Sequence, residues 1–145
     1  MTNISKTLRV PFTAQQMYAL INDIEAYPDF LPWCKAATVH HKSDVDLKAT
    51  LCLSKGPLSH SITTQNTMQP HSQINMMYSA GPFKNCAGSW RFVPVQQNEQ
   101  CDIIFNFEYE FANRLTAFAI EPIFFPISNT LIDAFYQRAI QIYGK

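Results

Sequence analysis

The most regular alternation of apolar and polar residues runs from position 101 to position 111. Every second residue from Ile103 to Phe111 is large and apolar, whereas Asn106, Glu108 and Glu110 fall between them. Successive side chains of a strand point to opposite faces of the sheet. This pattern therefore predicts an antiparallel strand with one covered face and one face in water.

Six further stretches have strand character, and turn residues separate several of them. The breaks are Lys55-Gly56-Pro57, Gln69-Pro70 and Gly81-Pro82, which favour turns. The spacing of about ten residues is typical of an antiparallel meander. We expect strands at residues 4–10, 37–41, 46–54, 58–68, 73–80 and 89–95.

A first helix is predicted after the first strand. Thr13 and Gln16 have the spacing of a capping box, in which each side chain bonds the other residue's backbone N–H. Apolar residues at 17, 20, 21 and 24 then follow one helical face. Pro28 should end this helix, because the residue before a proline avoids the helical region.

The last 30 residues predict one long helix. Asn113 suits the N-cap and Gly144 the C-terminal end. We expect the inward stripe to carry Pro122 and Pro126, which would kink or split the helix. The stripe comprises Leu115, Phe118, Ala119, Ile123, Ile127, Leu131, Ala134, Phe135, Ala139 and Ile142.

This order of elements predicts an α+β fold, with residues 1–145 as a single domain. A curved antiparallel sheet of six to seven strands must cover its aromatic face, and the long C-terminal helix is the obvious cover. The space between sheet and helix is where we expect a ligand.

Composition narrows the class of function. Charged residues make up 15% of the chain and aromatic residues 13%, with 11 basic against 11 acidic residues. Zero net charge argues against DNA as a partner, because a phosphate grip needs a cationic surface. The four cysteines form no C-x-x-C pair, and no segment resembles a signal peptide or a membrane span. We therefore expect a cytoplasmic protein with reduced thiols.

The segment "INDIEAYPDFLPWCK" (residues 21–35) is unusually apolar and stiff for a connection. It holds Tyr27, Phe30 and Trp33 beside two prolines. One interpretation is a packed cap over an open edge of the sheet. The other is the lip of a ligand entrance, since aromatic rings offer large apolar area at little entropic cost.

Candidate catalytic groups are few. His40 and His41 are adjacent, so on a strand they point to opposite faces and cannot share a metal ion. Glu108 and Glu110 share a face that we interpret as solvated. We find no nucleophile, metal or phosphate-binding motif, and expect neither catalytic nor metal-binding residues. His60 is the one histidine that could bond a ligand, although a structural role is the simpler interpretation.

Two motifs carry a resemblance to a known family. The segment "INDIEAYPDFLPWC" resembles an Asp-x-x-x-Tyr-Pro-x-Phe-Leu-Pro-x-Cys signature, and "GPFKNCAGSWRF" (81–92) resembles a Gly-Pro-Phe-(Lys/Arg)…Trp-x-Phe motif. Both are features of the coenzyme Q-binding, START-like polyketide cyclase/lipid transport family. The chain is most similar to its bacterial members named ribosome association toxins. Pro122 and Pro126 depart from the family, whose last helix is usually unbroken.

The resemblance implies a helix-grip (START/Bet v 1-like) fold with an apolar tunnel under the last helix. It implies a non-enzymatic protein that binds ubiquinone, with no other cofactor, in support of respiratory quinone function. The alternative is a toxin that binds the large ribosomal subunit and blocks subunit joining, for which Lys35, Lys42 and Lys48 could form a basic patch. A polyketide cyclase-type enzyme is a third possibility.

The predicted ligand contacts combine the covered strand faces, the stiff segment and the inward helix stripe. Phe83, with Lys84 and Arg91 nearby, is also a candidate for peripheral contact with a membrane. The predicted tunnel and mouth comprise Tyr27, Phe30, Trp33, His60, Ile62, Met76, Tyr78, Phe83, Trp90, Phe92, Phe105, Phe107, Tyr109, Phe118, Ile123, Ile127, Leu131 and Phe135.

Overall fold

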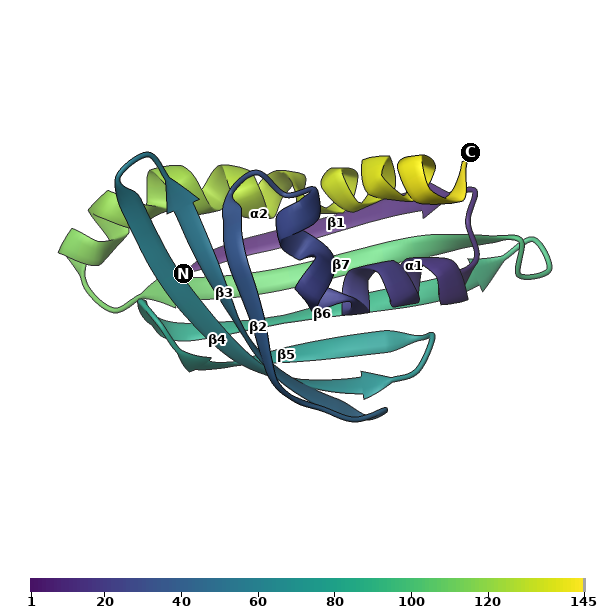
Figure 1. Cartoon of the computed structure of the whole chain (residues 1–145), viewed down its shortest axis with the longest axis horizontal. Coiled ribbons are helices and arrows are strands. Elements are labelled where there is room, and N and C mark those ends of the chain that lie inside the picture. Colours follow the sequence, from purple (N-terminus) through teal and green to yellow (C-terminus); the bar gives the residue numbers. More distant parts are fainter. Residues whose placement is uncertain (145) are drawn as a thin grey trace.

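The computed structural model describes residues 1–144 and contains one sheet, two α-helices and one 3-10 segment (Figure 1). The predicted α+β class, with a sheet beneath a long C-terminal helix, is confirmed. The elements in chain order are β1 (Thr2–Val10), α1 (Ala14–Asn22), η1 (Ile24–Asp29), β2 (Cys34–Lys42), β3 (Asp46–Lys55), β4 (Leu58–Gln69), β5 (Gln73–Ala80), β6 (Phe83–Val95), β7 (Gln100–Phe111) and α2 (Arg114–Tyr143).

The seven strands form one antiparallel sheet in the order β1-β7-β6-β5-β4-β3-β2. Strands β2 to β7 are a meander, as the spacing of the turns predicts. Strand β1 pairs with β7, with Thr2 opposite Tyr109, so the first and last strands of the chain lie side by side. The segment from α1 to η1 carries the chain from β1 at one edge to β2 at the other.

The first helix begins as predicted and ends earlier than predicted. The Thr13 N–H donates to Gln16 Oε1 over 2.9 Å, and the Gln16 N–H donates to Thr13 Oγ1 over 3.1 Å, which completes the capping box. The helix ends at Asn22, well before Pro28. A 3-10 segment follows and contains that proline, so the expectation that Pro28 ends the α-helix is wrong.

The long helix α2 is continuous from Arg114 to Tyr143. Asn113 Oδ1 accepts from the Thr116 N–H over 2.9 Å, and Gly144 closes the helix in the left-handed conformation, as predicted. Pro122 and Pro126 lie inside the helix without splitting it, and both are exposed. Their predicted inward position is therefore wrong.

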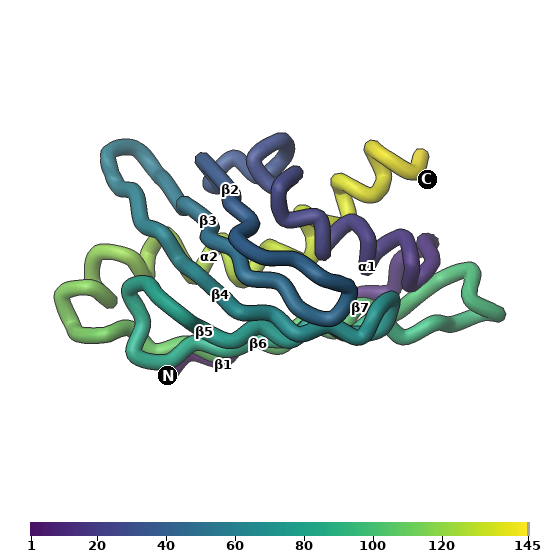
Figure 2. Tube along the Cα trace, turned by 60° about the horizontal axis from the view of Figure 1, so that its bottom comes forward, coloured from purple at the N-terminus to yellow at the C-terminus, as the bar shows by residue number. Residues whose placement is uncertain are grey.

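Helix α2 covers the inner face of the sheet through large aromatic contacts. Phe124 packs edge-on against Tyr109 at a ring separation of 4.8 Å, and Phe135 packs against Trp90 at 5.5 Å. At the far end, the Tyr143 hydroxyl donates to the Gln16 carbonyl over 2.9 Å, which joins α2 to α1. Figure 2 shows α1, η1 and the last turns of α2 gathered on the same side of the sheet.

Candidate ligand-binding cavity

A largely apolar cavity of about 110 Å³ lies between the inner face of the sheet and α2. Its walls come from η1, from strands β3 to β7, and from the middle of α2, with the last residues of α1 at one end. The volume approaches that of an engineered protein cavity of about 150 Å³ that holds benzene. In this structure the space therefore suits a single ring.

Half of the predicted contact residues line this cavity. They come from the stiff segment, the covered strand faces and the centre of α2, which the sequence analysis expected to converge. Their role as ligand contacts stays a prediction. These residues are Tyr27, Trp33, Ile62, Met76, Trp90, Phe105, Phe107, Ile127 and Leu131.

Other predicted contacts lie outside the cavity and pack around it. Phe135 is fully buried against the rings of Tyr27 and Phe30, at 5.2 and 5.7 Å. Phe83, Tyr78 and Tyr109 form an aromatic cluster beyond one end of the cavity, where Phe83 is 5.8 Å from Tyr109. Because Phe83 is only 5% exposed, its predicted contact with a membrane surface is wrong.

Four predicted contacts lie farther away. His60 and Ile123 line a small hollow near the start of β4, which shares Leu53, Ile62 and Phe124 with the cavity wall. Phe92 is buried against Tyr18, toward α1. Phe118 is 85% exposed on the outside of α2, so its predicted position in the tunnel is wrong.

The segment at residues 21–35 is both a packed cap and part of the cavity wall. The Tyr27 hydroxyl donates to the Ile21 carbonyl, and burial is the main cause that raises the pKa of this hydroxyl. The guanidinium of Arg138 lies 4.9 Å from the centre of the Phe30 ring. Trp33 stays half-buried and lines the cavity. The two interpretations of this segment are therefore compatible.

Polar lining residues were missed by the sequence analysis. Asn22, Thr64, Asn66 and Ser128 line the cavity among the apolar side chains. Asn66 is 3% exposed, and its Oδ1 atom has no hydrogen-bond partner. The signal was present in the sequence, because the alternation that places Ile62 and Thr64 on the inner face of β4 also places Asn66 there.

The cavity wall contains no histidine, carboxylate or cationic side chain within residues 1–144. Its ionisable groups are Tyr27 and Cys86, and burial raises the pKa of the Cys86 thiol to about 12. Over the same residues, no cluster of three or more histidine, cysteine or acidic side chains could hold a metal ion.

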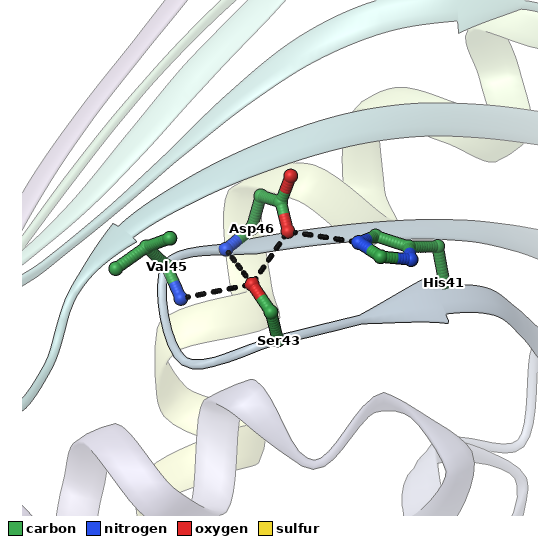
Figure 3. Close-up of polar contacts among 4 residues, drawn as sticks. All are labelled: His41, Ser43, Val45 and Asp46. Carbon is green, nitrogen blue, oxygen red and sulfur yellow. Dashed lines mark hydrogen bonds and ion pairs between the residues drawn. The ribbon is translucent and has the colours of Figure 1, made fainter.

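The adjacent histidines lie on the β2–β3 hairpin, away from the cavity. His40 Nε2 lies 2.7 Å from Thr50 Oγ1. His41 Nε2 lies 3.0 Å from Asp46 Oδ1, which also accepts from Ser43 Oγ over 2.6 Å (Figure 3). The bond from Ser43 is the largest cause that lowers the pKa of Asp46. These contacts order a hairpin turn.

The outer face of α2 is unusually apolar. Leu115 is 83% exposed, Phe118 85% and Phe125 41%. By length and composition α2 could cross a membrane, and only 22% of its most apolar window is buried. One helix of this kind is weak evidence for a membrane span, because the core helix of a globular protein can have the same length and composition. The inner face of the same helix nevertheless packs on the sheet, with Phe135 and Ala139 fully buried.

Comparison with known proteins agrees with this architecture. The chain is 36% identical to the ribosome association toxin RatA of Pseudomonas aeruginosa over 143 residues, which is 99% of both chains. It is 28% identical to the mitochondrial coenzyme Q-binding protein COQ10 of Drosophila melanogaster over 132 residues, covering 89% of this chain and 54% of that protein. The crystal structure of the Zhui aromatase/cyclase from Streptomyces sp. R1128 superposes with a TM-score of 0.82, at 13% identity over 99% of this chain and 98% of the other.

A family model described as polyketide cyclase / dehydrase and lipid transport matches residues 10–136. This match covers both motifs of the sequence analysis and all strands of the sheet but the first. Together with the relatives, it confirms the resemblance that the two motifs carry. The chain belongs to the polyketide cyclase / dehydrase and lipid transport family.

Proposed function

We propose that this protein is a non-enzymatic binder of a hydrophobic lipid of the ubiquinone type. The observation that carries the proposal is the cavity under α2, whose wall is almost entirely aliphatic and aromatic. Apolar area that leaves water contributes roughly 25 cal/mol per Å², so such a wall holds a lipid without any reaction. The coenzyme Q-binding relative supports the ligand class.

The cavity suits the ring of such a ligand better than its tail. A space of about 110 Å³ accepts one ring, so a polyprenyl tail would extend past the wall or widen the cavity. The protein would then act in the cytoplasm, with peripheral contact at a membrane that contains quinone. The exposed apolar side chains of Leu115 and Phe118 on α2 are a suitable surface for that contact.

Extraction of the purified protein with organic solvent, followed by mass spectrometry, tests this proposal. A polyprenyl quinone in stoichiometric amount would support it. Fluorescence provides the solution assay, because Trp33 and Trp90 both line the cavity. A short-chain ubiquinone should quench them saturably. If neither single-tryptophan variant shows a saturable change and no lipid is extracted, the proposal fails.

A second candidate function is association with the ribosome. It is favoured by relatives of that name that match this chain at 36% identity over nearly its whole length. The balanced charge, 11 basic against 11 acidic residues, gives it no electrostatic support. Lys48 of β3 lies opposite His41, which is next to Lys42 on β2, so these two lysines are close together. Lys35 is at the other end of β2. Co-sedimentation with large ribosomal subunits at physiological salt is the test.

A cyclase-type reaction is the third candidate. It would need acid or base groups that converge on the bound substrate. The cavity wall offers only Tyr27 and Cys86 among the described residues, and burial holds the pKa of both groups above the ordinary values. The wall therefore favours binding over catalysis.

A further inference from the structure

The polar side chains of the cavity define what kind of ligand it can hold. Asn66 comes from β4 in the sheet, and Ser128 comes from α2, which covers the sheet. Both are nearly fully buried, at 3% and 4% exposure, and both line the cavity. Polar groups thus face the same space from the two layers that enclose it.

Asn66 is unusual because its Oδ1 atom is buried without a partner. Buried polar groups in folded proteins nearly always have a hydrogen-bond partner, and each exception needs an explanation. A side-chain amide carries both donors and an acceptor. It can therefore bond either a carbonyl or a hydroxyl oxygen on a molecule in the cavity.

The same wall disfavours charged ligands. Within residues 1–144 no lysine or arginine reaches the cavity, so a carboxylate or phosphate inside it would have no counter-charge. An unpaired charge in an apolar site is strongly disfavoured. The polar part of the ligand must therefore be neutral.

We propose that Asn66 is a specificity-determining residue that recognises the oxygen of a neutral, ring-sized polar group, and that the cavity rejects anionic lipids. This inference rests on the proposed lipid-binding function and specifies its ligand class. A quinone or quinol ring meets the requirement, and a fatty acid or a phospholipid headgroup does not.

Replacing Asn66 with leucine separates recognition from packing. Asn66→Leu removes the amide, with its unpartnered Oδ1 atom, and keeps a side chain of similar size. The affinity for a short-chain ubiquinone should fall about tenfold, which corresponds to about 1.4 kcal/mol and is typical of one lost hydrogen bond. The affinity for naphthalene, a hydrocarbon without oxygen, should be unchanged or higher.

The thermal midpoint of unfolding distinguishes recognition from a structural role. If Asn66 stabilised the fold, its replacement would lower the midpoint. Because Asn66 Oδ1 has no partner to lose, the Asn66→Leu midpoint should stay equal or rise. Thr67→Val is the matched control, since Thr67 follows Asn66 on the same strand but is exposed and lies outside the cavity. It should leave the ratio of ubiquinone to naphthalene affinity within twofold of wild type.

Charge rejection is tested with hexadecanol and palmitate, which share a chain and differ in the charge of the head. At pH 8 wild-type protein should bind hexadecanol at least 100-fold more tightly than palmitate, measured by calorimetry. Equal binding of the two would overturn the neutral-ligand inference.

The remaining outcomes are also decisive. If Asn66→Leu leaves ubiquinone affinity unchanged, or lowers ubiquinone and naphthalene affinity equally, Asn66 does not recognise the oxygen. If wild-type protein binds naphthalene but not ubiquinone, the cavity is a ligand site, but the ubiquinone-type ligand of the proposed function fails together with this inference. If wild-type protein binds none of the four probes, the proposed lipid-binding function itself fails.

Discussion

Gly88 keeps the cavity open, and adding one methyl group there should partly close it. Gly88 lies on β6 between Met76 of β5 and Phe107 of β7, and both neighbours line the cavity. A Cβ atom at Gly88 would lie 2.6 Å from Phe107 Cδ1 and 2.9 Å from Met76 Cε. Gly88→Ala should therefore push both side chains into the space that a ligand would use.

The size of the effect follows from these distances. Carbon atoms pack best at roughly 3.5–4.0 Å, so the Phe107 ring must move by about 1 Å. Phe105 and Tyr109 flank the ring at 5.8 and 5.7 Å and are almost fully buried, which leaves the cavity as the free direction. Overpacking of this kind costs about 1–3 kcal/mol, partly offset by about 0.5–1 kcal/mol from removing a glycine inside a strand.

We expect a net loss of about 1 kcal/mol in the free energy of unfolding, measured by urea denaturation, and at least a tenfold loss of affinity for a short-chain ubiquinone. Ser89→Ala is the control, because Ser89 lines a shallow hollow on the opposite face of the sheet. If Gly88→Ala matches wild type in both stability and affinity, Phe107 can yield without entering the cavity. The reasoning that Gly88 sets the cavity volume would then be wrong.

Three further predictions concern the sheet, the helix and the thiols. Phe105→Asp should destabilise the protein by more than about 3 kcal/mol or prevent folding, since it buries an unpaired charge. Asn106→Asp, on the face of β7 that is in water, should change the urea midpoint little. Equal effects of the two substitutions would mean that the two faces of the strand are wrongly assigned. Replacing Pro122 and Pro126 with alanine should raise the thermal midpoint, because proline is unfavourable inside a helix. The affinity for ubiquinone should stay within twofold of wild type, since both prolines are exposed. A lowered midpoint or a larger change in affinity would contradict this prediction. At pH 8 only the half-buried Cys52 should react quickly with a thiol reagent. Burial raises the pKa of the other three thiols and keeps them protonated. Fast labelling of more than one thiol per native chain would refute this prediction.

The strand pattern was predictable where alternation is strong and failed where turn residues are frequent. The alternation over residues 101–111 identified β7 within one residue at its start. Strand β6 begins at Phe83, six residues before the predicted start, because Lys84, Asn85 and Gly88 resemble a loop when taken alone. Pairing with β7, in which Phe83 lies opposite Phe111, extends the strand, and a single sequence does not display that pairing.

The inward face of α2 was the main error in the predicted site. Its N-terminal half is apolar nearly all round, so a 3.6-residue period fits more than one face. The predicted stripe chose Leu115 and Phe118, which are exposed, and omitted Ile120 and Phe124, which are buried. The sheet decides between the faces, because the Phe124 ring fits against Phe83 and Tyr109. Asn66 was missed for a different reason, since an asparagine within a strand suggests an exposed position.

The pairing of β1 with β7 also affects how the chain folds. Thr2 meets Tyr109 across more than a hundred residues, so this pairing closes a very long loop, whereas the hairpins from β2 to β7 form locally. During synthesis β1 emerges before β7 and must wait for it, and α2 emerges after β7. Until then the inner face of the meander is uncovered and its aromatic residues are in water. The nascent chain should therefore be most prone to aggregation after β7 has left the ribosome and before α2 has done so.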